Sequence, residues 1–195
     1  MAIGCTNRRR WTSEMASDAS NEEVESVEEV LLDQGVLQET PDGTDFELTD
    51  RADAAVRGEL DAIDDLDDAL DRARPWLGVD PDLIRFERDG DAVTLYFKER
   101  NIGAYPSEAA ILADVAIAAV LLDWVDGWEE FETRRRGEIV SGVRLFLDVC
   151  PACDEAVTFD SKTVESCCGT YDVAALVCRN CGARLYESGP IEASE

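Results

Sequence analysis

The residues whose types and spacing could do chemistry are cysteines in the last quarter of the chain. Cys150 and Cys153 form one Cys-x-x-Cys pair, and Cys178 and Cys181 form a second. Each pair can place two thiolates on one side of a tight turn, and two such turns that face each other supply four sulfur ligands in a tetrahedron. Zinc binds thiolates and imposes no geometry of its own, so the spacing predicts a zinc site formed by these four cysteines.

The residues around the two pairs indicate how the chain would position them. Gly182 directly follows Cys181 and can take a positive φ, which turns backbone amides toward the sulfurs. The equivalent residue after the first pair is Asp154, which tolerates this conformation less well than glycine. Stretches rich in strand-forming residues lie between and after the turns, at residues 156–159, 173–177 and 183–186.

This spacing resembles that of the zinc-ribbon family. The resemblance covers residues 149–187, and it implies a zinc ribbon with four cysteine ligands, built from short antiparallel strands. A unit of this size buries too little apolar surface to fold securely alone, and zinc can contribute on the order of 10 kcal/mol to its stability. Because four protein thiolates leave no open position for water, the metal is expected to stabilise the fold and not to catalyse.

Cys167 and Cys168 lie between the two pairs and leave three alternatives open. They could supply additional metal ligands, fill the core as small apolar residues, or form a redox pair. The chain has seven cysteines, an odd number, and its start has no signal-peptide pattern, so a disulfide framework is not expected.

The chain is extremely acidic, with a net charge of −26, yet 45% of its residues are hydrophobic. This hydrophobic content is far too high for a disordered acidic tail. Lys98 and Lys162 are the only lysines, and acids are spread along the whole chain. The composition favours a cytoplasmic protein of an extreme halophile, because molar salt shortens the Debye length to about 3 Å and screens self-repulsion. A nucleic-acid mimic is the alternative. As a whole, the chain resembles haloarchaeal proteins with a C-terminal zinc ribbon.

The sequence predicts an α+β fold in four parts. The parts are a disordered N-terminal extension, an α+β body, the zinc ribbon and a loose tail, at residues 1–19, 20–148, 149–187 and 188–195. The extension carries Arg8-Arg9-Arg10, and its composition differs so much from the rest that Met15 is an alternative start to Met1.

Residues 20–74 predict a helix, a hairpin and a second helix. A capping box at Ser20 to Glu23 begins the first helix, which ends at Gly35. The hairpin turns at residues 41–43, and Thr49 caps the second, longer helix. Apolar residues recur along one face of that helix, at Ala52, Val56, Leu60, Ile63, Leu66 and Leu70. The hairpin and the helix after it resemble the wing of winged-helix proteins. A plain helix–hairpin–helix unit is the alternative.

Residues 75–148 predict a hairpin packed on a buried helix. The hairpin strands are expected at residues 83–87 and 92–98, followed by a bend at 101–103. Ser107 caps the apolar helix 109–122, in which Asp114 is expected to face an edge or to pair with an arginine.

A last helix is predicted from Trp128 to about Asp148, and residues 143–149 could alternatively form a strand. The arginines of the run 134–136 are expected to be neutralised by Glu130 and Glu132, each four residues before an arginine. The short connection into the first cysteine turn predicts that the ribbon packs against the body.

The sequence contains no Gly-rich phosphate loop, no nucleophile elbow and no histidine, so nothing in it argues for an enzyme. The leading hypothesis is a non-enzymatic zinc-ribbon protein that acts as an interaction or transcription-accessory module. A protein partner is expected, and DNA is a weaker candidate because no basic face is visible. The alternatives are a thiol-redox or metal-handling protein that uses Cys167 and Cys168, and a structural subunit of an assembly. The apolar stretch 109–122 is too short to span a membrane.

Overall fold

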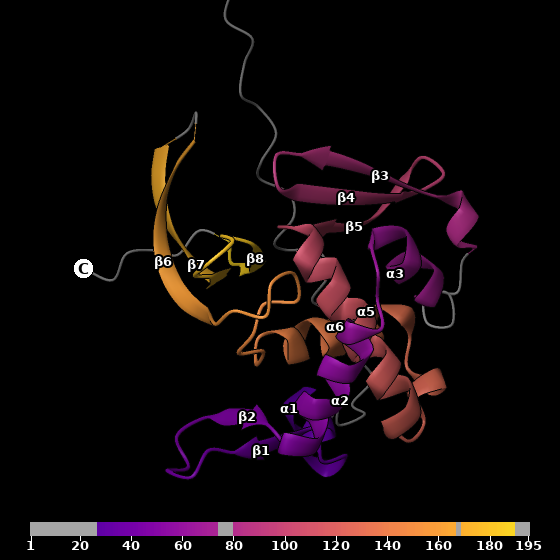
Figure 1. Ribbon diagram of the computed structural model, residues 1–195, viewed down its shortest axis with the longest axis vertical. Coiled ribbons are helices and arrows are strands. Elements are labelled where there is room, and N and C mark those ends of the chain that lie inside the picture. The colour runs from indigo at the N-terminus through magenta and orange to yellow at the C-terminus, as the bar shows by residue number, and fades with distance from the viewer. Residues whose placement is uncertain (1–26, 74–79, 167–168, 190–195) are drawn as a thin grey trace, which may run out of the picture.

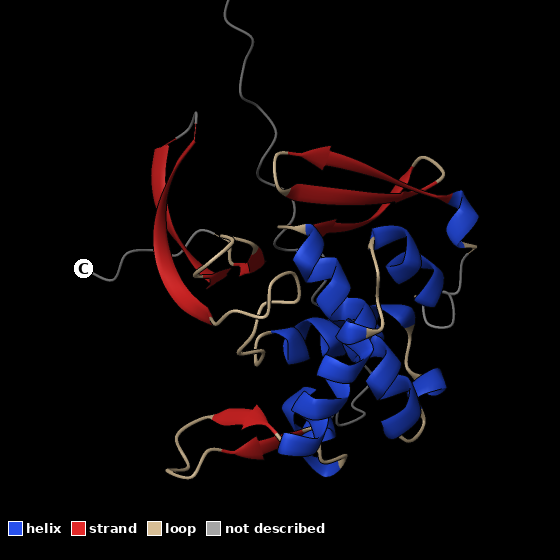
Figure 2. Cartoon of the chain, viewed as in Figure 1, coloured by secondary structure: helices blue, strands red, loops and turns tan. Residues whose placement is uncertain are grey.

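The structure is a computed structural model that describes residues 27–73, 80–166 and 169–189. Within these residues it is a mixed α+β fold (Figures 1 and 2). The described residues form five α-helices: α1 (Val27–Asp33), α2 (Asp50–Asp61), α3 (Leu66–Arg72), α5 (Glu108–Trp124) and α6 (Thr133–Arg144). The strands form three antiparallel sheets: β1 (Leu37–Glu39) with β2 (Phe46–Leu48); β3 (Ile84–Asp89), β4 (Ala92–Phe97) and β5 (Arg100–Tyr105); and β6 (Val157–Ser166), β7 (Gly169–Cys178) and β8 (Arg184–Glu187).

Helix α5 lies at the centre, as the apolar stretch predicts. It contacts α2, α3, α6, β5 and β8, and most of its side chains are buried. Ser107 begins it, because the Ser107 hydroxyl accepts a hydrogen bond from the amide of Ala110. A helix that is apolar all round must be covered on every side, and Figure 1 shows the other elements arranged around α5. Among the described residues, no helix is long and apolar enough to cross a membrane.

A short hairpin lies between α1 and α2 in the described residues. Strands β1 and β2 pair with Leu37 opposite Leu48. Gly35 ends α1 with a φ of 66°, and the Thr49 side chain caps α2 by accepting from the amide of Ala52. The capping box at Ser20 to Glu23 and the extension 1–19 lie outside the described residues, so the resemblance to winged helices stays a prediction.

The single long helix predicted after Thr49 is wrong, because it divides into α2 and α3. Asp65 begins α3, and its carboxylate accepts a hydrogen bond of 2.9 Å from the amide of Asp68. A continuous helix would place Asp61 and Asp64 one turn from Asp65 and Asp68, and like charges at that spacing are destabilising. An aspartate that caps a new helix relieves this repulsion.

The bend predicted at residues 101–103 is wrong, because these residues belong to β5. The strand carries an irregularity: Gly103 lies opposite Leu95 and Asn101 opposite Tyr96, so Ile102 has no partner. A Cβ on Gly103 would lie 2.9 Å from the ring of Tyr105, so only glycine lets that ring fold back over the strand. A bulge with a glycine resembles a turn in sequence, which explains the missed strand.

The last helix is shorter than predicted. Trp128 begins only a 3-10 turn, Trp128–Glu130, and α6 then runs from Thr133 to Arg144. Glu130 and Glu132 therefore precede α6, and the predicted pairing with the arginines is wrong. Glu138 takes that role, at 3.0 Å from Arg134. The alternative strand at residues 143–149 is also wrong, since only an isolated bridge pairs Val149 with Ala156.

The cysteine-rich sheet packs against the body, as the short connection predicts. Val157, Leu176 and Leu185 of this sheet are buried in the same core cluster as residues of α5 and α6. The buried Ser107 hydroxyl donates a hydrogen bond of 2.6 Å to the carbonyl of Arg184 on β8. The residue that caps the central helix is thus joined directly to the last strand.

Candidate metal centre

The four cysteines of the two Cys-x-x-Cys pairs converge in one cluster. Their Sγ atoms all lie within 4.8 Å of one another. Cys150 Sγ is 3.7 Å from Cys181 Sγ, and Cys153 Sγ is 3.5 Å from Cys178 Sγ. These separations are far longer than a disulfide bond of about 2.05 Å, and all four cysteines are free.

Two backbone turns of the same form hold these cysteines. In the first, the amide of Asp154 donates to the carbonyl of Cys150, and in the second the amide of Gly182 donates to the carbonyl of Cys178. Each turn then closes in the same way, because the amides of Cys150 and Cys178 donate to the carbonyls five residues further on. Asp154 has a φ of 57° and Gly182 a φ of 75°, which confirms the conformation predicted from the sequence.

Substitutions at Gly182 and Asp154, the two turn residues with a positive φ, are expected to have opposite effects on stability. Replacing Gly182 with alanine is expected to lower the free energy of unfolding by about 1–2 kcal/mol, because a Cβ disfavours this φ although it would meet no atom within 4 Å. Replacing Asp154 with glycine is expected to raise it by up to about 1 kcal/mol, since glycine relieves the same strain. The measurement is denaturant unfolding of the metal-loaded protein. Gly58→Ala in α2, which is equally open but has no positive φ, is the control and should not destabilise.

The electrostatics of the cluster favour a bound cation. Cys150 is fully buried, and this burial raises the pKa of its thiol far above the usual value. Burial also opposes ionisation of Cys178, but the backbone amides of Cys181 and Asn180 donate to its sulfur, and the pKa falls to about 6. The amide of Ala183 favours ionisation of Cys181, but burial and the neighbouring sulfurs outweigh it and raise the pKa. One thiolate can therefore form unaided, whereas four adjacent thiolates require a positive ion between them.

The donor set fits zinc. A zinc–sulfur distance of about 2.3 Å in a tetrahedron gives sulfur–sulfur separations of about 3.8 Å. The pairs Cys150–Cys181 and Cys153–Cys178, at 3.7 and 3.5 Å, already have nearly this spacing. Four thiolates are soft ligands, which select zinc, copper(I) or iron over magnesium and calcium. The cluster can hold a metal ion of the thiolate-binding class.

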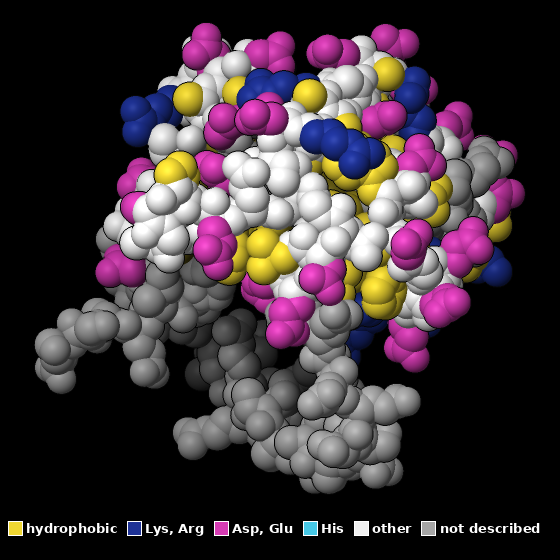
Figure 3. Space-filling view, turned by 90° about the horizontal axis from the view of Figure 1, so that it is seen from below, with side chains coloured by type: hydrophobic (Ala, Val, Ile, Leu, Met, Phe, Trp, Pro, Cys, Tyr) yellow, Lys and Arg dark blue, Asp and Glu magenta, His cyan; other side chains and the backbone are white. Residues whose placement is uncertain are grey.

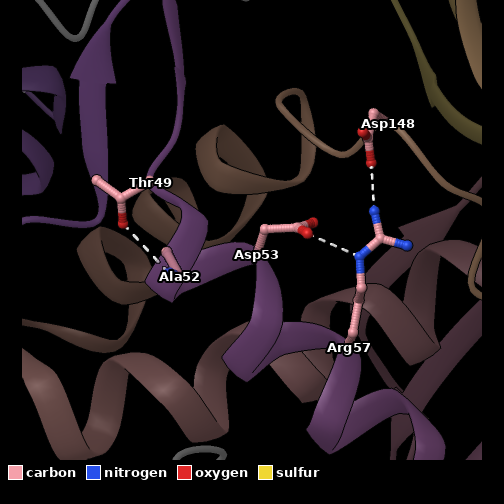
Figure 4. A network of polar contacts seen from close by, with 5 residues as sticks. All are labelled: Thr49, Ala52, Asp53, Arg57 and Asp148. Carbon is pink, nitrogen blue, oxygen red and sulfur yellow. Dashed lines mark hydrogen bonds and ion pairs between the residues drawn. The ribbon is translucent and has the colours of Figure 1, made fainter.

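An arginine network joins α2 to the segment that leads into the first cysteine turn (Figure 4). Arg57 Nε lies 2.7 Å from Asp53 on the preceding turn of α2, and Arg57 Nη2 lies 2.8 Å from Asp148. Asp53 precedes Arg57 by four residues, a spacing at which opposite charges on a helix pair. The contact with Asp148 was missed because the two residues are 91 positions apart and no local pattern relates them.

Cys167 and Cys168 lie outside the described residues, and their use as ligands, core or redox pair stays a prediction. The residues on either side of them, Ser166 and Gly169, pair at one end of the β6–β7 hairpin, whereas Cys178 pairs with Val157 at the other end. At about 3.3 Å per residue, Gly169 lies roughly 30 Å along the strand from Cys178. Among the described residues, the sulfurs that converge are those of Cys150, Cys153, Cys178 and Cys181.

A buried ion pair lies elsewhere in the body. Asp114 on α5 is 4% exposed and lies 2.6 Å from Nη1 of Arg144 on α6, so the predicted pairing with an arginine is confirmed. Burial raises the pKa of Asp114 to about 6, although Arg144 and a hydrogen bond from the Tyr105 hydroxyl oppose the shift. Burial also raises the pKa of Tyr105. The ring of Tyr105 lies 5.8 Å from the Arg144 guanidinium carbon, so the three side chains join α5, α6 and β5.

Two family models match the chain, and their boundary falls where α6 gives way to the cysteine-rich sheet. Residues 25–145 match the central domain of a family of unknown function, DUF8054, and residues 148–188 match the C-terminal domain of the same family. Searches of curated proteins and of solved structures gave no match. Since the central-domain model alone spans more than half of the sequence, the chain belongs to the DUF8054 family.

Proposed function

We propose that this chain is a zinc-stabilised interaction protein, whose metal holds the C-terminal ribbon against the body and whose body binds a protein partner. The observation that supports the proposal is the convergence of four cysteine sulfurs from two matching turns. Every ligand position of a tetrahedral ion is then filled by the chain itself. A site of this kind has no position for water or substrate and serves the fold.

The basic side chains near the hairpin support a protein partner over DNA. Arg51 stacks on Trp124, with its guanidinium carbon 3.8 Å from the ring centre. Arg57 is held between Asp53 and Asp148. Arginines that are committed in this way cannot track a phosphate backbone without breaking internal contacts. The wing-like hairpin is the ground for placing the partner in the transcription machinery.

The surface supports a halophilic cytoplasm as the setting. Figure 3 shows acidic side chains spread over one face of the molecule, with lysine and arginine confined to a few places. A net charge of −26 generates self-repulsion that dilute buffer screens poorly and molar salt screens well. We therefore expect the free energy of unfolding to rise with salt concentration up to the molar range.

Cobalt(II) substitution tests whether the metal site is closed. Cobalt-loaded protein should show the absorption of a tetrahedral tetrathiolate centre, and small ligands such as azide or cyanide at moderate concentration should leave that spectrum unchanged, because no position is open. A spectrum that shifts saturably with added ligand, while all cobalt stays bound, would reveal an open position and contradict the proposal. Thiol titration with metal content followed in parallel tests the redox alternative, which requires Cys167 and Cys168 to oxidise rapidly and reversibly.

A further inference from the structure

A groove lies between the β1–β2 hairpin and the ribbon, which Figure 1 shows on the same side of the helical body. We call it the Phe159 groove. It has a volume of about 430 Å³, and its walls come from β2, from the link after α6, and from β6 and β7; they include Phe46, Glu47, Phe146, Asp148, Phe159 and Leu176. A neighbouring hollow of about 270 Å³ shares three of these residues and extends the groove toward Asp50 and Asp53.

We propose that the Phe159 groove binds a basic peptide segment of a partner protein, anchored by one apolar or aromatic side chain, and that metal binding at the cysteine cluster assembles the groove. The second part rests on the proposed function. The inference goes further, because it assigns a surface and the chemistry of its ligand.

The floor of the groove is apolar and incompletely covered. Phe159 is 59% exposed, compared with 48% for Leu83 and 40% for Ile102. Phe46 and Phe146 are only partly buried against the core below it. Full burial of a phenylalanine side chain is worth about 1.5–3 kcal/mol, so a ligand that covers Phe159 gains a substantial part of that energy. Aromatic residues that are covered in this way are typical binding hot spots.

The rim of the groove is acidic. Asp45 and Glu47 line it on the hairpin side, and Asp50 lines the neighbouring hollow. Arg57 pairs with both Asp53 and Asp148, so its single positive charge offsets one of these two negative charges. In the part of the chain that the structure describes, no basic side chain forms an ion pair with Asp45, Glu47 or Asp50. The hairpin side of the rim thus presents negative charge beside an apolar floor, with no ion-pair partner for these three acids among the described residues.

The acidic rim and the apolar floor together favour one class of ligand for the groove. Arginine or lysine residues on either side of an apolar anchor would match the rim and the floor together. A second copy of the chain would bring the same carboxylates against each other, and a nucleic acid would bring phosphates against them, so both are disfavoured. A basic protein segment is the ligand class that the charges and the apolar floor both favour.

The walls of the groove make it depend on the metal. Phe159 and Leu176 lie opposite each other on β6 and β7, close to the end at which Val157 pairs with Cys178. Asp148 lies two residues before Cys150. Loss of the metal would release the cysteine turns that fix these strands, and the ribbon side of the groove would lose its position.

The test uses the full-length, metal-loaded protein and a capped heptapeptide with two arginines on each side of a central tryptophan. Calorimetric titration, at the lowest salt concentration at which the protein stays folded, should show saturable binding. Phe159→Ser and the double variant Glu47→Lys/Asp50→Lys should each weaken it about tenfold or more. The matched controls are Leu83→Ser, another exposed apolar residue, and Glu99→Lys, an exposed acid on the β4–β5 turn, which should change the affinity less than about twofold.

Several outcomes would overturn the inference. The proposal that the groove binds a basic peptide would be contradicted by metal-loaded protein that fails to bind the peptide. It would also be contradicted by equal affinity for a version with glutamates in place of the arginines. Either result leaves the proposed zinc-stabilised fold intact. Protein that folds and binds the peptide equally with and without metal contradicts the metal dependence. Deletion of residues 1–14, which carry Arg8-Arg9-Arg10-Trp11, addresses the chain's own basic segment: a tenfold gain in affinity would make that segment the occupant and contradict a separate partner.

Discussion

Cys178→Ser is expected to abolish tight metal binding and to unfold the cysteine-rich sheet. Cys178 is 1% exposed, and its sulfur lies 3.5 Å from that of Cys153 in the cluster. A structural zinc ion contributes on the order of 10 kcal/mol to a small unit, which is comparable with the whole stability of a typical domain. Val157, Leu176 and Leu185 of the sheet belong to the same core as α5 and α6, so the body should also be destabilised. The measurements are metal content and denaturant unfolding, with and without a chelator.

Serine variants of two other cysteines are the controls for Cys178→Ser. Cys167→Ser and Cys168→Ser should keep the metal content of the unaltered protein, because the strand carries their neighbours roughly 30 Å from the cluster. A chelator should destabilise these variants as it does the unaltered protein, and should have no further effect on Cys178→Ser. Cys178→Ser protein that retains one tightly bound metal ion per chain would contradict the predicted ligand set.

The second large effect is expected at the buried ion pair. Asp114→Leu should lower the free energy of unfolding by about 3–5 kcal/mol, because it leaves the buried guanidinium of Arg144 without its carboxylate. The double variant Asp114→Leu/Arg144→Met removes both charges and should recover most of that loss. Thermal and denaturant unfolding of the two variants measure the difference. A double variant no more stable than Asp114→Leu would show that shape, and not charge, accounts for the cost.

The same pair predicts a pH dependence with a definite sign. The pKa of Asp114 is raised by burial to about 6 from an ordinary 3.8, so the folded protein binds this proton more tightly than the unfolded chain. Protonation of Asp114 therefore stabilises the folded protein fully below pH ~4, and this stabilisation is lost as the pH rises through about 6. The difference in stability between the unaltered protein and Asp114→Asn, measured across this interval, isolates the group from the other carboxylates. A difference that does not change with pH would contradict the raised pKa.

The parts of the molecule that sequence predicts well are those set by local chemistry. The cysteine turns follow from two spacings and from the left-handed residues after them, Asp154 and Gly182. The hairpin β1–β2, the caps at Thr49 and Ser107 and the apolar helix α5 follow from short patterns as well. In each case the residues that determine the structure lie within a few positions of one another.

The features that sequence misses depend on distant contacts or on competing local signals. The contact of Arg57 with Asp148 joins residues 91 positions apart, and the Phe159 groove takes its walls from four separate segments. The division between α2 and α3 reflects repulsion among aspartates, which the apolar period of the same stretch conceals. In β5, Gly103, which lies next to the bulge and makes room for the ring of Tyr105, is also what makes the strand resemble a turn.

X-ray absorption at the metal edge of the native protein, with elemental analysis of the same sample, tests the metal centre most directly. One zinc ion per chain, surrounded by four sulfur atoms at about 2.3 Å, is the predicted result. A zinc shell that contains oxygen or nitrogen, or protein that folds with no metal in stoichiometric amount, would contradict the assignment of Cys150, Cys153, Cys178 and Cys181 as a closed structural site.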